Sequence, residues 1–221
     1  MDINTSEAFF VFDLDDTLYN EADYRKSGIA SVADCLNSIT GRKVDFLIDG
    51  VISNEDGDFL GEICRRLDLP ENLKEALLWQ YRLHTPRISL AKEVKDLLDF
   101  LQEFSSGVSI VTDGRIISQR KKLIALGINH IPSYISEEFG AVKPDPTRFE
   151  LIERLNPRCR FVYIGDNPQK DFITPKKMGW ITFGLLDNGH NIHSQEVRNV
   201  SEQYLPHIWL RKLEDLRDHL H

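Results

Sequence analysis

The sequence predicts an α/β fold, a doubly wound parallel sheet with a Rossmann-like core and a small helical cap domain. Apolar runs suited to strands that are buried on both faces recur along the chain. From about residue 89 onward, segments with helical periodicity alternate with these runs, and the strongest runs end in acidic residues. Because ligands of such sheets bind beyond the carboxyl ends of the strands, these endings mark the expected site.

Residues typical of β-strands are grouped at five places in the sequence. The first, residues 8–14, is a continuous apolar run that ends in acid. Residues 107–114 and 160–167 repeat that pattern with β-branched and aromatic side chains, which pack well on a pleated surface. Residues 180–184 and 206–210 are shorter, and they predict a fourth and a fifth strand.

Helical periodicity lies between the later strands. Residues 94–101 place apolar side chains at helical spacing, and Leu123 and Leu126 continue a second helix that Gly127 ends. The charged segment 210–221 is expected to form a helix on the surface.

Residues 18–88 interrupt the alternation of strands and helices. Three helices with acidic and polar residues at their starts are expected there, at about 23–38, 56–67 and 71–84. A stretch of this length is too long for a simple crossover between strands. We therefore expect an α/β catalytic core built from residues 1–17 and 89–221, and a helical cap built from residues 18–88.

Composition excludes several classes of protein. The 27 Lys and Arg residues against 35 Asp and Glu give a net charge of −8, and basic residues are not clustered, so neither nucleic acid nor an anionic membrane is an expected partner. Apolar runs are far shorter than the roughly 20 residues that a membrane span needs. The acidic N-terminus does not resemble a signal peptide, and the three cysteines form no CxxC pair. We expect a cytoplasmic protein without a zinc site or a disulfide framework.

Polar clusters follow the first three predicted strands. A lysine between two of them, in Lys-Pro-Asp-Pro, is held in a rigid extended loop by its prolines. One lysine is therefore expected to face a group of carboxylates at the edge of the sheet. The candidate residues, in chain order, are Asp13, Asp15, Thr112, Asp113, Gly114, Lys143, Asp166 and Asp171.

The three polar clusters and the Lys-Pro-Asp-Pro loop together resemble the four motifs of the haloacid dehalogenase superfamily of phosphohydrolases, over about residues 8–186. The helical insertion lies where one large branch of that superfamily carries its cap. Residues 81–86, Arg115 with Gln119, and residues 165–167 are similar to the branch with nucleotidase-like and sugar-phosphatase-like members. The resemblance implies an enzyme, a phosphatase of that superfamily.

The expected chemistry uses two carboxyl groups. Phosphate monoesters hydrolyse so slowly that no single group supplies the whole acceleration. A carboxylate nucleophile divides the reaction into two steps through an aspartyl-phosphate, and we assign this role to Asp13. Asp15 is expected to protonate the leaving oxygen and later to deprotonate the attacking water. Because crowded carboxylates raise one another's pKa, we expect Asp15 to start protonated.

Charge counting then calls for a cation. Three ionised aspartates and Lys143 leave an excess negative charge that one Mg²⁺ would cancel, and oxygen ligands suit Mg²⁺ better than zinc. The expected ligands are Asp13, Asp166, the Asp15 carbonyl, and Asp171 either directly or through water.

The phosphoryl oxygens need donors as well. We expect them to be held by the Thr112 hydroxyl, the backbone N–H groups of Asp113 and Gly114, and Lys143.

The leading hypothesis is a Mg²⁺-dependent hydrolase of a small phosphate ester, a nucleotide or sugar phosphate, over which the cap closes. A dehalogenase is disfavoured because its leaving group needs no acid such as Asp15. A signalling receiver domain is disfavoured because it has no cap. A phosphomutase of the same fold and a phosphate-binding protein without catalysis stay open as alternatives. The substrate and the oligomeric state also stay open, as do the roles of Tyr19, Asn20, Tyr24, His84 and Arg115.

Overall fold

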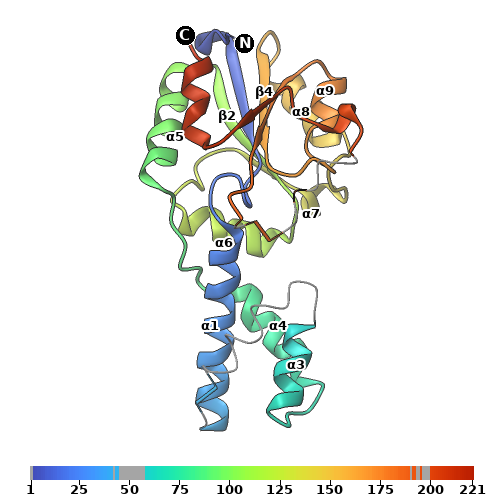
Figure 1. Cartoon of the computed structure of the whole chain (residues 1–221). Coiled ribbons are helices and arrows are strands. Elements are labelled where there is room, and N and C mark those ends of the chain that lie inside the picture. The colour runs from blue at the N-terminus through green and yellow to red at the C-terminus, as the bar shows by residue number, and fades with distance from the viewer. Residues whose placement is uncertain (1, 42, 45–57, 190, 193–194, 196–199) are drawn as a thin grey trace.

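A parallel sheet forms the centre of the molecule in a computed structural model, which describes residues 2–41, 43–44, 58–189, 191–192, 195 and 200–221. Within these residues six strands pair in the order β3-β2-β1-β4-β5-β6, and every pairing is parallel. This order reverses beside β1, as in doubly wound folds (Figure 1). The predicted α/β class is confirmed. The strands are β1 (Ala8–Phe12), β2 (Gly107–Thr112), β3 (Ser133–Ile135), β4 (Arg160–Gly165), β5 (Ile181–Leu185) and β6 (Ile208–Leu210).

Helices cover both faces of this sheet and also form a separate group below it (Figure 1). The α-helices are α1 (Glu21–Thr40), α3 (Phe59–Arg66), α4 (Leu73–Leu83), α5 (Lys92–Phe104), α6 (Ile116–Ala125), α7 (Ser136–Phe139), α8 (Thr147–Leu155) and α9 (Ile173–Lys177). The 3₁₀ helices are η1 (Thr5–Glu7), η2 (Glu202–Tyr204) and η3 (Leu213–His219). None of the helices in the described ranges is long and apolar enough to cross a bilayer.

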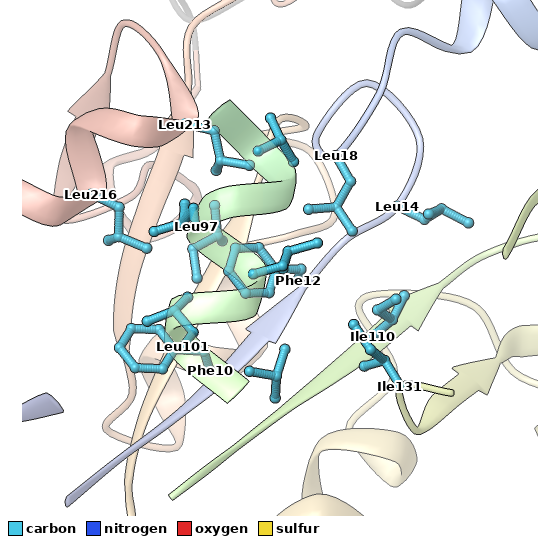
Figure 2. Close-up of a cluster of buried hydrophobic side chains, with 14 of the residues drawn as sticks. Phe10, Phe12, Leu14, Leu18, Leu97, Leu101, Ile110, Ile131, Leu213 and Leu216 are labelled. Carbon is cyan, nitrogen blue, oxygen red and sulfur yellow. The ribbon is translucent and has the colours of Figure 1, made fainter. Parts of the chain in front are cut away.

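Strand β1 is apolar on both faces because both faces are covered. Successive side chains of a strand point to opposite sides of the sheet, and all five residues of β1 are buried. Phe10 and Phe12 belong to the core cluster that includes Leu97 and Leu101 of α5, as Figure 2 shows. The opposite face packs Phe9 and Val11 against a second cluster, with Phe149 and Ile152 of α8 and with Trp180.

The C-terminal segment corrects one expectation. The surface helix predicted over residues 210–221 is confirmed only over Leu213–His219, where it is the 3₁₀ helix η3, while Leu210 is the end of β6. Leu213 and Leu216, three residues apart, are 3% and 0% exposed and pack beside α5 (Figure 2). The high charge of this segment belongs to its outer side only.

The strands expected from composition are present, with one addition. Strand β3 has three residues, Ser133–Ile135, and pairs with the end of β2. Too short and too polar for a strand pattern, it did not stand out in the sequence.

The inserted helices α1, α3 and α4 build a core of their own. Helix α1 begins at an Asn20 side chain that accepts the Ala22 N–H, and it ends at Gly41 in the left-handed region. The expected start of the second inserted helix near residue 56 lies outside the described residues, and α3 begins at Phe59. The buried cluster of these helices contains Val32, Leu36, Leu60, Ile63 and Leu77.

The two ends of the described chain meet at the amino ends of the strands (Figure 1). The Ile3 N–H donates to the His219 carbonyl at 2.8 Å, and the His221 N–H donates to the Ile3 carbonyl at 3.1 Å. The carboxyl ends of the strands, where polar clusters are predicted, lie at the opposite edge of the sheet.

Candidate active site

A cavity of about 120 Å³ lies at the carboxyl ends of the strands. Asp13 directly follows β1 and Asp166 directly follows β4, which neighbours β1 in the sheet. The backbone continues the pairing here, since the Asp13 N–H donates to the Ile164 carbonyl at 2.8 Å. The residues that line the cavity include Asp13, Asp15, Glu21, Thr112, Asp166 and Lys170.

A buried lysine joins two of the predicted carboxylates. The Lys143 Nζ lies 2.7 Å from an oxygen of Asp13 and 2.6 Å from an oxygen of Asp171, and the Lys143 side chain is 0% exposed. It also donates to the Tyr163 hydroxyl at 3.2 Å. We refer to Lys143, Asp13, Asp166 and Asp171 as the Lys143 cluster.

Negative charge is in excess within the Lys143 cluster. Burial raises the pKa of Asp13 to about 6, although the Lys143 ammonium opposes this shift. Burial, together with repulsion from Asp171 and Asp13, raises the pKa of Asp166 to about 9. Burial also acts on Asp171, but the Lys143 ammonium outweighs it and holds the pKa of Asp171 below its usual value.

The same three carboxylates form a group that can hold a cation. One oxygen from each of Asp13, Asp166 and Asp171 lies within 4.8 Å of the others. The donors are all oxygens, which hard divalent cations prefer, and a cation there would offset the repulsion that raises the pKa of Asp166. The residues present therefore fit a metal ion of this kind.

Asp15 has different neighbours from those expected. Its carboxylate accepts from Lys122 Nζ at 2.7 Å, from Gln119 Nε2 at 2.8 Å and from the Tyr19 hydroxyl. Burial favours the neutral acid, but the Lys122 ammonium and these hydrogen bonds outweigh it and lower the pKa of Asp15. The expectation that Asp15 starts protonated is wrong, because its nearest partners are donors rather than acids.

Glu21, the first residue of α1, is the second acid beside Lys122. The Lys122 Nζ lies 3.6 Å from a Glu21 oxygen. Burial and the nearby Asp15 carboxylate raise the pKa of Glu21 to about 7. We refer to Lys122, Asp15, Glu21 and Gln119 as the Lys122 cluster.

The loop after β2 meets the cavity at Thr112 and Asp113. Thr112 is buried, and its hydroxyl oxygen accepts from Gln119 Nε2 at 2.5 Å. The Asp113 carboxylate accepts from Arg148 at 2.6 Å and from the Lys143 N–H at 3.2 Å, which ties two loops of the site together.

Gly114 lies beyond the wall of this cavity. Its N–H donates to the Ser136 hydroxyl at 2.9 Å, and the residues lining the cavity include Thr112 and Asp113 but not Gly114. Within the described structure, the predicted phosphate-binding group therefore meets the cavity through Thr112 and Asp113.

The residues whose roles the sequence left open divide into two groups. Tyr19 donates to Asp15, and the Tyr24 ring lies 4.3 Å from Lys122 Nζ, so both support the Lys122 cluster. Asn20 caps α1 through its side chain. Arg115 is exposed and pairs with Glu137 at 2.6 Å, away from the cavity.

His84 packs against aromatic rings. It is buried, and its ring centroid lies 5.0 Å from that of Tyr24 and 5.9 Å from that of Tyr81. Burial holds the pKa of His84 below its ordinary value. Its contacts are those of a packing residue.

Lys122 and Lys170 are two cations of the site that sequence reasoning missed. Lys122 belongs to a polar face of α6 that is buried together with Ser118 and Gln119. The spacing of Gln119 and Lys122 on a helix that follows Thr112 was the available signal. Lys170 lines the cavity with a one-third exposed side chain, and nothing in its local sequence distinguishes it from a surface lysine.

The fold and the site together define a class of protein. The sheet is doubly wound, Asp13 after β1 pairs with the buried Lys143, and acids after β4 can hold a cation together with Asp13. These are the features of an α/β hydrolytic enzyme. Residues 10–185 match the family model described as haloacid dehalogenase-like hydrolase. The chain belongs to this family, as the sequence motifs predict.

Relatives of the chain agree with this assignment. A protein of Methanocaldococcus jannaschii named glyceraldehyde 3-phosphate phosphatase is 31% identical, with 80% of this chain and 83% of that protein covered. The prediction of an enzyme of the phosphatase kind is confirmed at this level.

Solved structures share the fold. A HAD phosphatase from Thermococcus onnurineus superposes with a TM-score of 0.60 at 23% identity, and 96% of each chain is covered. A 2-haloacid dehalogenase from Pseudomonas syringae pv. Tomato superposes with a TM-score of 0.62 at 20% identity, over 96% of this chain and 97% of that one. The fold alone thus does not separate the two activities.

Proposed function

We propose that the protein is a Mg²⁺-dependent phosphomonoester hydrolase that acts on a small phosphorylated metabolite through an aspartyl-phosphate on Asp13. One observation carries the proposal: the Asp13 carboxylate faces the cavity while the buried Lys143 ammonium lies 2.7 Å from one of its oxygens. A carboxylate held in this way is oriented as a nucleophile, and the ammonium lies beside the carboxylate that would carry the phosphoryl group.

In the first step an oxygen of Asp13 attacks phosphorus, and the bond from phosphorus to the ester oxygen breaks. Thr112 and Lys143 hold the transferring oxygens, and the leaving oxygen takes a proton from Asp15. Because Lys122 holds Asp15 ionised without substrate, the proton must be gained as the substrate binds. The negative phosphoryl group raises the proton affinity of a nearby carboxylate and so favours this change.

In the second step Asp15 accepts a proton from water. The water oxygen bonds to phosphorus, the acyl phosphate bond breaks, and the Asp13 carboxylate is restored with release of inorganic phosphate. The lowered pKa of Asp15 suits this role as a base.

Asp13, Asp166 and Asp171 are the side chains proposed to hold Mg²⁺, with the Asp15 carbonyl as a further ligand. When bound, the ion supplies positive charge that neutralises the phosphoryl group in both steps. Between the two steps, Lys143 remains the cation that orients Asp13.

The substrate is proposed to be a small sugar phosphate, with glyceraldehyde 3-phosphate as the first choice. The M. jannaschii relative carries that name, and a cavity of about 120 Å³ suits a short carbon chain. Residues 18–88 are proposed to act as the cap, because the helices described there have their own buried cluster and contact α6 beside the cavity.

The test is a substrate screen with metal control. Glyceraldehyde 3-phosphate, other sugar phosphates and nucleoside monophosphates are incubated with the enzyme in Mg²⁺ or in EDTA, and released phosphate is measured. We expect release that requires Mg²⁺, is fastest for short sugar phosphates and disappears in Asp13→Asn. The matched control Asp218→Asn changes an exposed aspartate and should leave the rates unchanged.

Several results would contradict this assignment. Activity that survives EDTA would remove the metal from the proposal. Rearrangement of a sugar phosphate without release of phosphate would identify a mutase. Equal activity of Asp13→Asn and the parent would remove the nucleophile.

A further inference from the structure

We propose that Gln119 and Lys122 of α6 are positioning residues that set the orientation of Asp15, an inference that rests on the proposed function. Both side chains are buried, with Gln119 1% and Lys122 3% exposed. They lie three residues apart, on one face of a helix whose first residue comes four positions after Thr112. Helix α6 therefore presents an amide and an ammonium side by side to the loop after β1.

The two donors hold different oxygens of one carboxylate. Lys122 Nζ donates to Oδ1 of Asp15 at 2.7 Å, and Gln119 Nε2 donates to Oδ2 at 2.8 Å. A carboxyl group bound at a single oxygen can turn about its last torsion, which is a soft one. Donors at both oxygens remove this freedom, so the pair, together with the Tyr19 hydroxyl at Oδ1, fixes where the acid–base oxygen points.

Only one of the two flipped orientations of the Gln119 side-chain amide fits the groups around it. Its nitrogen contacts the Asp15 carboxylate and, at 3.2 Å, the Asp113 carbonyl, and both of these groups can only accept. The amide nitrogen therefore also faces the Thr112 hydroxyl oxygen, which must act as an acceptor there. The Thr112 hydrogen is left to point elsewhere, and Thr112 lines the cavity.

Lys122 adds a link to the first inserted helix. Its ammonium lies 3.6 Å from Glu21, the first residue of α1, and 4.3 Å from the Tyr24 ring centroid. A lysine that only joined two parts of the fold would serve equally well with any buried acid as its partner. Both acids line the cavity, and this lysine makes its shorter contact, 2.7 Å, with Asp15, the acid to which the proton transfer is assigned.

A positioning role and a purely structural role predict different dependences of the rate on the leaving group of the substrate. An alkoxide leaving group needs a proton, whereas 4-nitrophenolate is stable enough to leave without one. Loss of a residue that acts through Asp15 should therefore slow alkyl phosphates more than 4-nitrophenyl phosphate. Loss of a purely structural residue should slow both substrates by the same factor.

The experiment compares kcat/KM for these two substrates in Gln119→Met and Lys122→Met. The alkyl substrate is the sugar phosphate that the parent hydrolyses fastest. We expect the alkyl phosphate to lose about tenfold or more beyond the loss on 4-nitrophenyl phosphate, as a fraction of a general-acid contribution of about 10²–10⁴. Lys122→Arg keeps a cationic donor and should recover part of this loss.

A matched control is Lys121→Met, which removes the neighbouring, half-buried lysine and should leave the ratio unchanged. The ratio does not depend on how much of a variant folds, because unfolded protein lowers both rates equally. Equal losses on both substrates, or no loss, would overturn the inference. A parent enzyme that hydrolyses neither substrate would instead overturn the proposed function, and the inference with it.

Discussion

The Lys143 cluster and the Lys122 cluster place aspartates two positions apart in the chain in opposite surroundings. Asp13 shares Lys143 with Asp171 and lies near Asp166, and its pKa rises to about 6. Asp15 lies 2.7 Å from Lys122 and also accepts from an amide and a hydroxyl, and its pKa falls. Two residues of one motif thus differ because Asp13 meets one donor that it shares with another buried acid, whereas Asp15 meets a lysine, an amide and a hydroxyl. The motif fixes where the carboxyl groups are, and their neighbours fix the protonation.

The first prediction contrasts these two aspartates directly. Asp13→Asn should lower kcat/KM by roughly 10⁴-fold or more on every phosphate ester, because loss of a nucleophile removes both steps. Asp15→Asn should lower it by about 10²–10⁴-fold on alkyl phosphates and by less on 4-nitrophenyl phosphate. Steady-state kinetics on both substrates measure the difference. Equal losses for the two variants on 4-nitrophenyl phosphate would break the contrast.

The second prediction concerns the two lysines. Lys143→Met leaves the buried Asp13 and Asp171 without a counter-charge, and the free energy of unfolding should fall by about 3–5 kcal/mol in EDTA. Lys122→Met should cost less, because the side chains of Asp15 and Glu21 are 16% and 25% exposed. Urea denaturation measures both values. In the double variant Lys143→Met with Asp171→Asn, part of the loss should be recovered. A larger loss of stability in Lys122→Met than in Lys143→Met would contradict the contrast.

The third prediction uses the pKa of Glu21, which burial and Asp15 raise from 4.5 to about 7. The folded protein binds this proton more tightly than the unfolded chain does. The stabilising contribution is therefore complete below pH 4.5 and is lost as the pH rises through 7. In Glu21→Gln the free energy of unfolding should fall less steeply between these pH values, by up to about 1.4 kcal/mol per pH unit.

Denaturation at a series of pH values measures that slope. The exposed Glu71→Gln is the control and should keep the slope of the parent. A Glu21→Gln variant with an unchanged slope would show that Glu21 does not titrate in this range.

The smallest effect is expected outside both clusters. Arg115 is 61% exposed and pairs with Glu137 at the surface, so Arg115→Ala should change the free energy of unfolding by less than about 1 kcal/mol. Its kcat/KM should stay close to that of the parent, since Arg115 does not line the cavity. A large rise in KM would instead mean that Arg115 reaches the substrate.

The parts of the fold that follow from local pattern could be predicted from the sequence. Buried parallel strands are apolar throughout, so β1, β2 and β4 stand out, and their acidic endings locate Asp13 and Asp166. Strand β3 is too short to carry such a pattern. The charged tail does form a helix, but its composition does not reveal that Leu213 and Leu216 are buried or that the helix is of the short 3₁₀ type.

The site was predictable only where strand ends or a loop held by prolines placed the residue. Lys122 stands on a helix, and it reaches Asp15 only through the packing of α6 against the loop after β1. The protonation of Asp15 was misjudged for the same reason, because counting acids along the chain leaves out donors that arrive from elsewhere in the fold.

The hydrogen bonds that join Ile3 to the segment around His219 have a practical consequence for handling the enzyme. A tag, a fusion partner or a tether to a solid support at either end of the described chain would lie across the sheet from the cavity. The proximity of the ends also allows them to be joined by a short peptide, with new ends opened at an exposed turn such as Pro157–Arg158. Such a circular permutant would leave the path of substrates to the cavity clear.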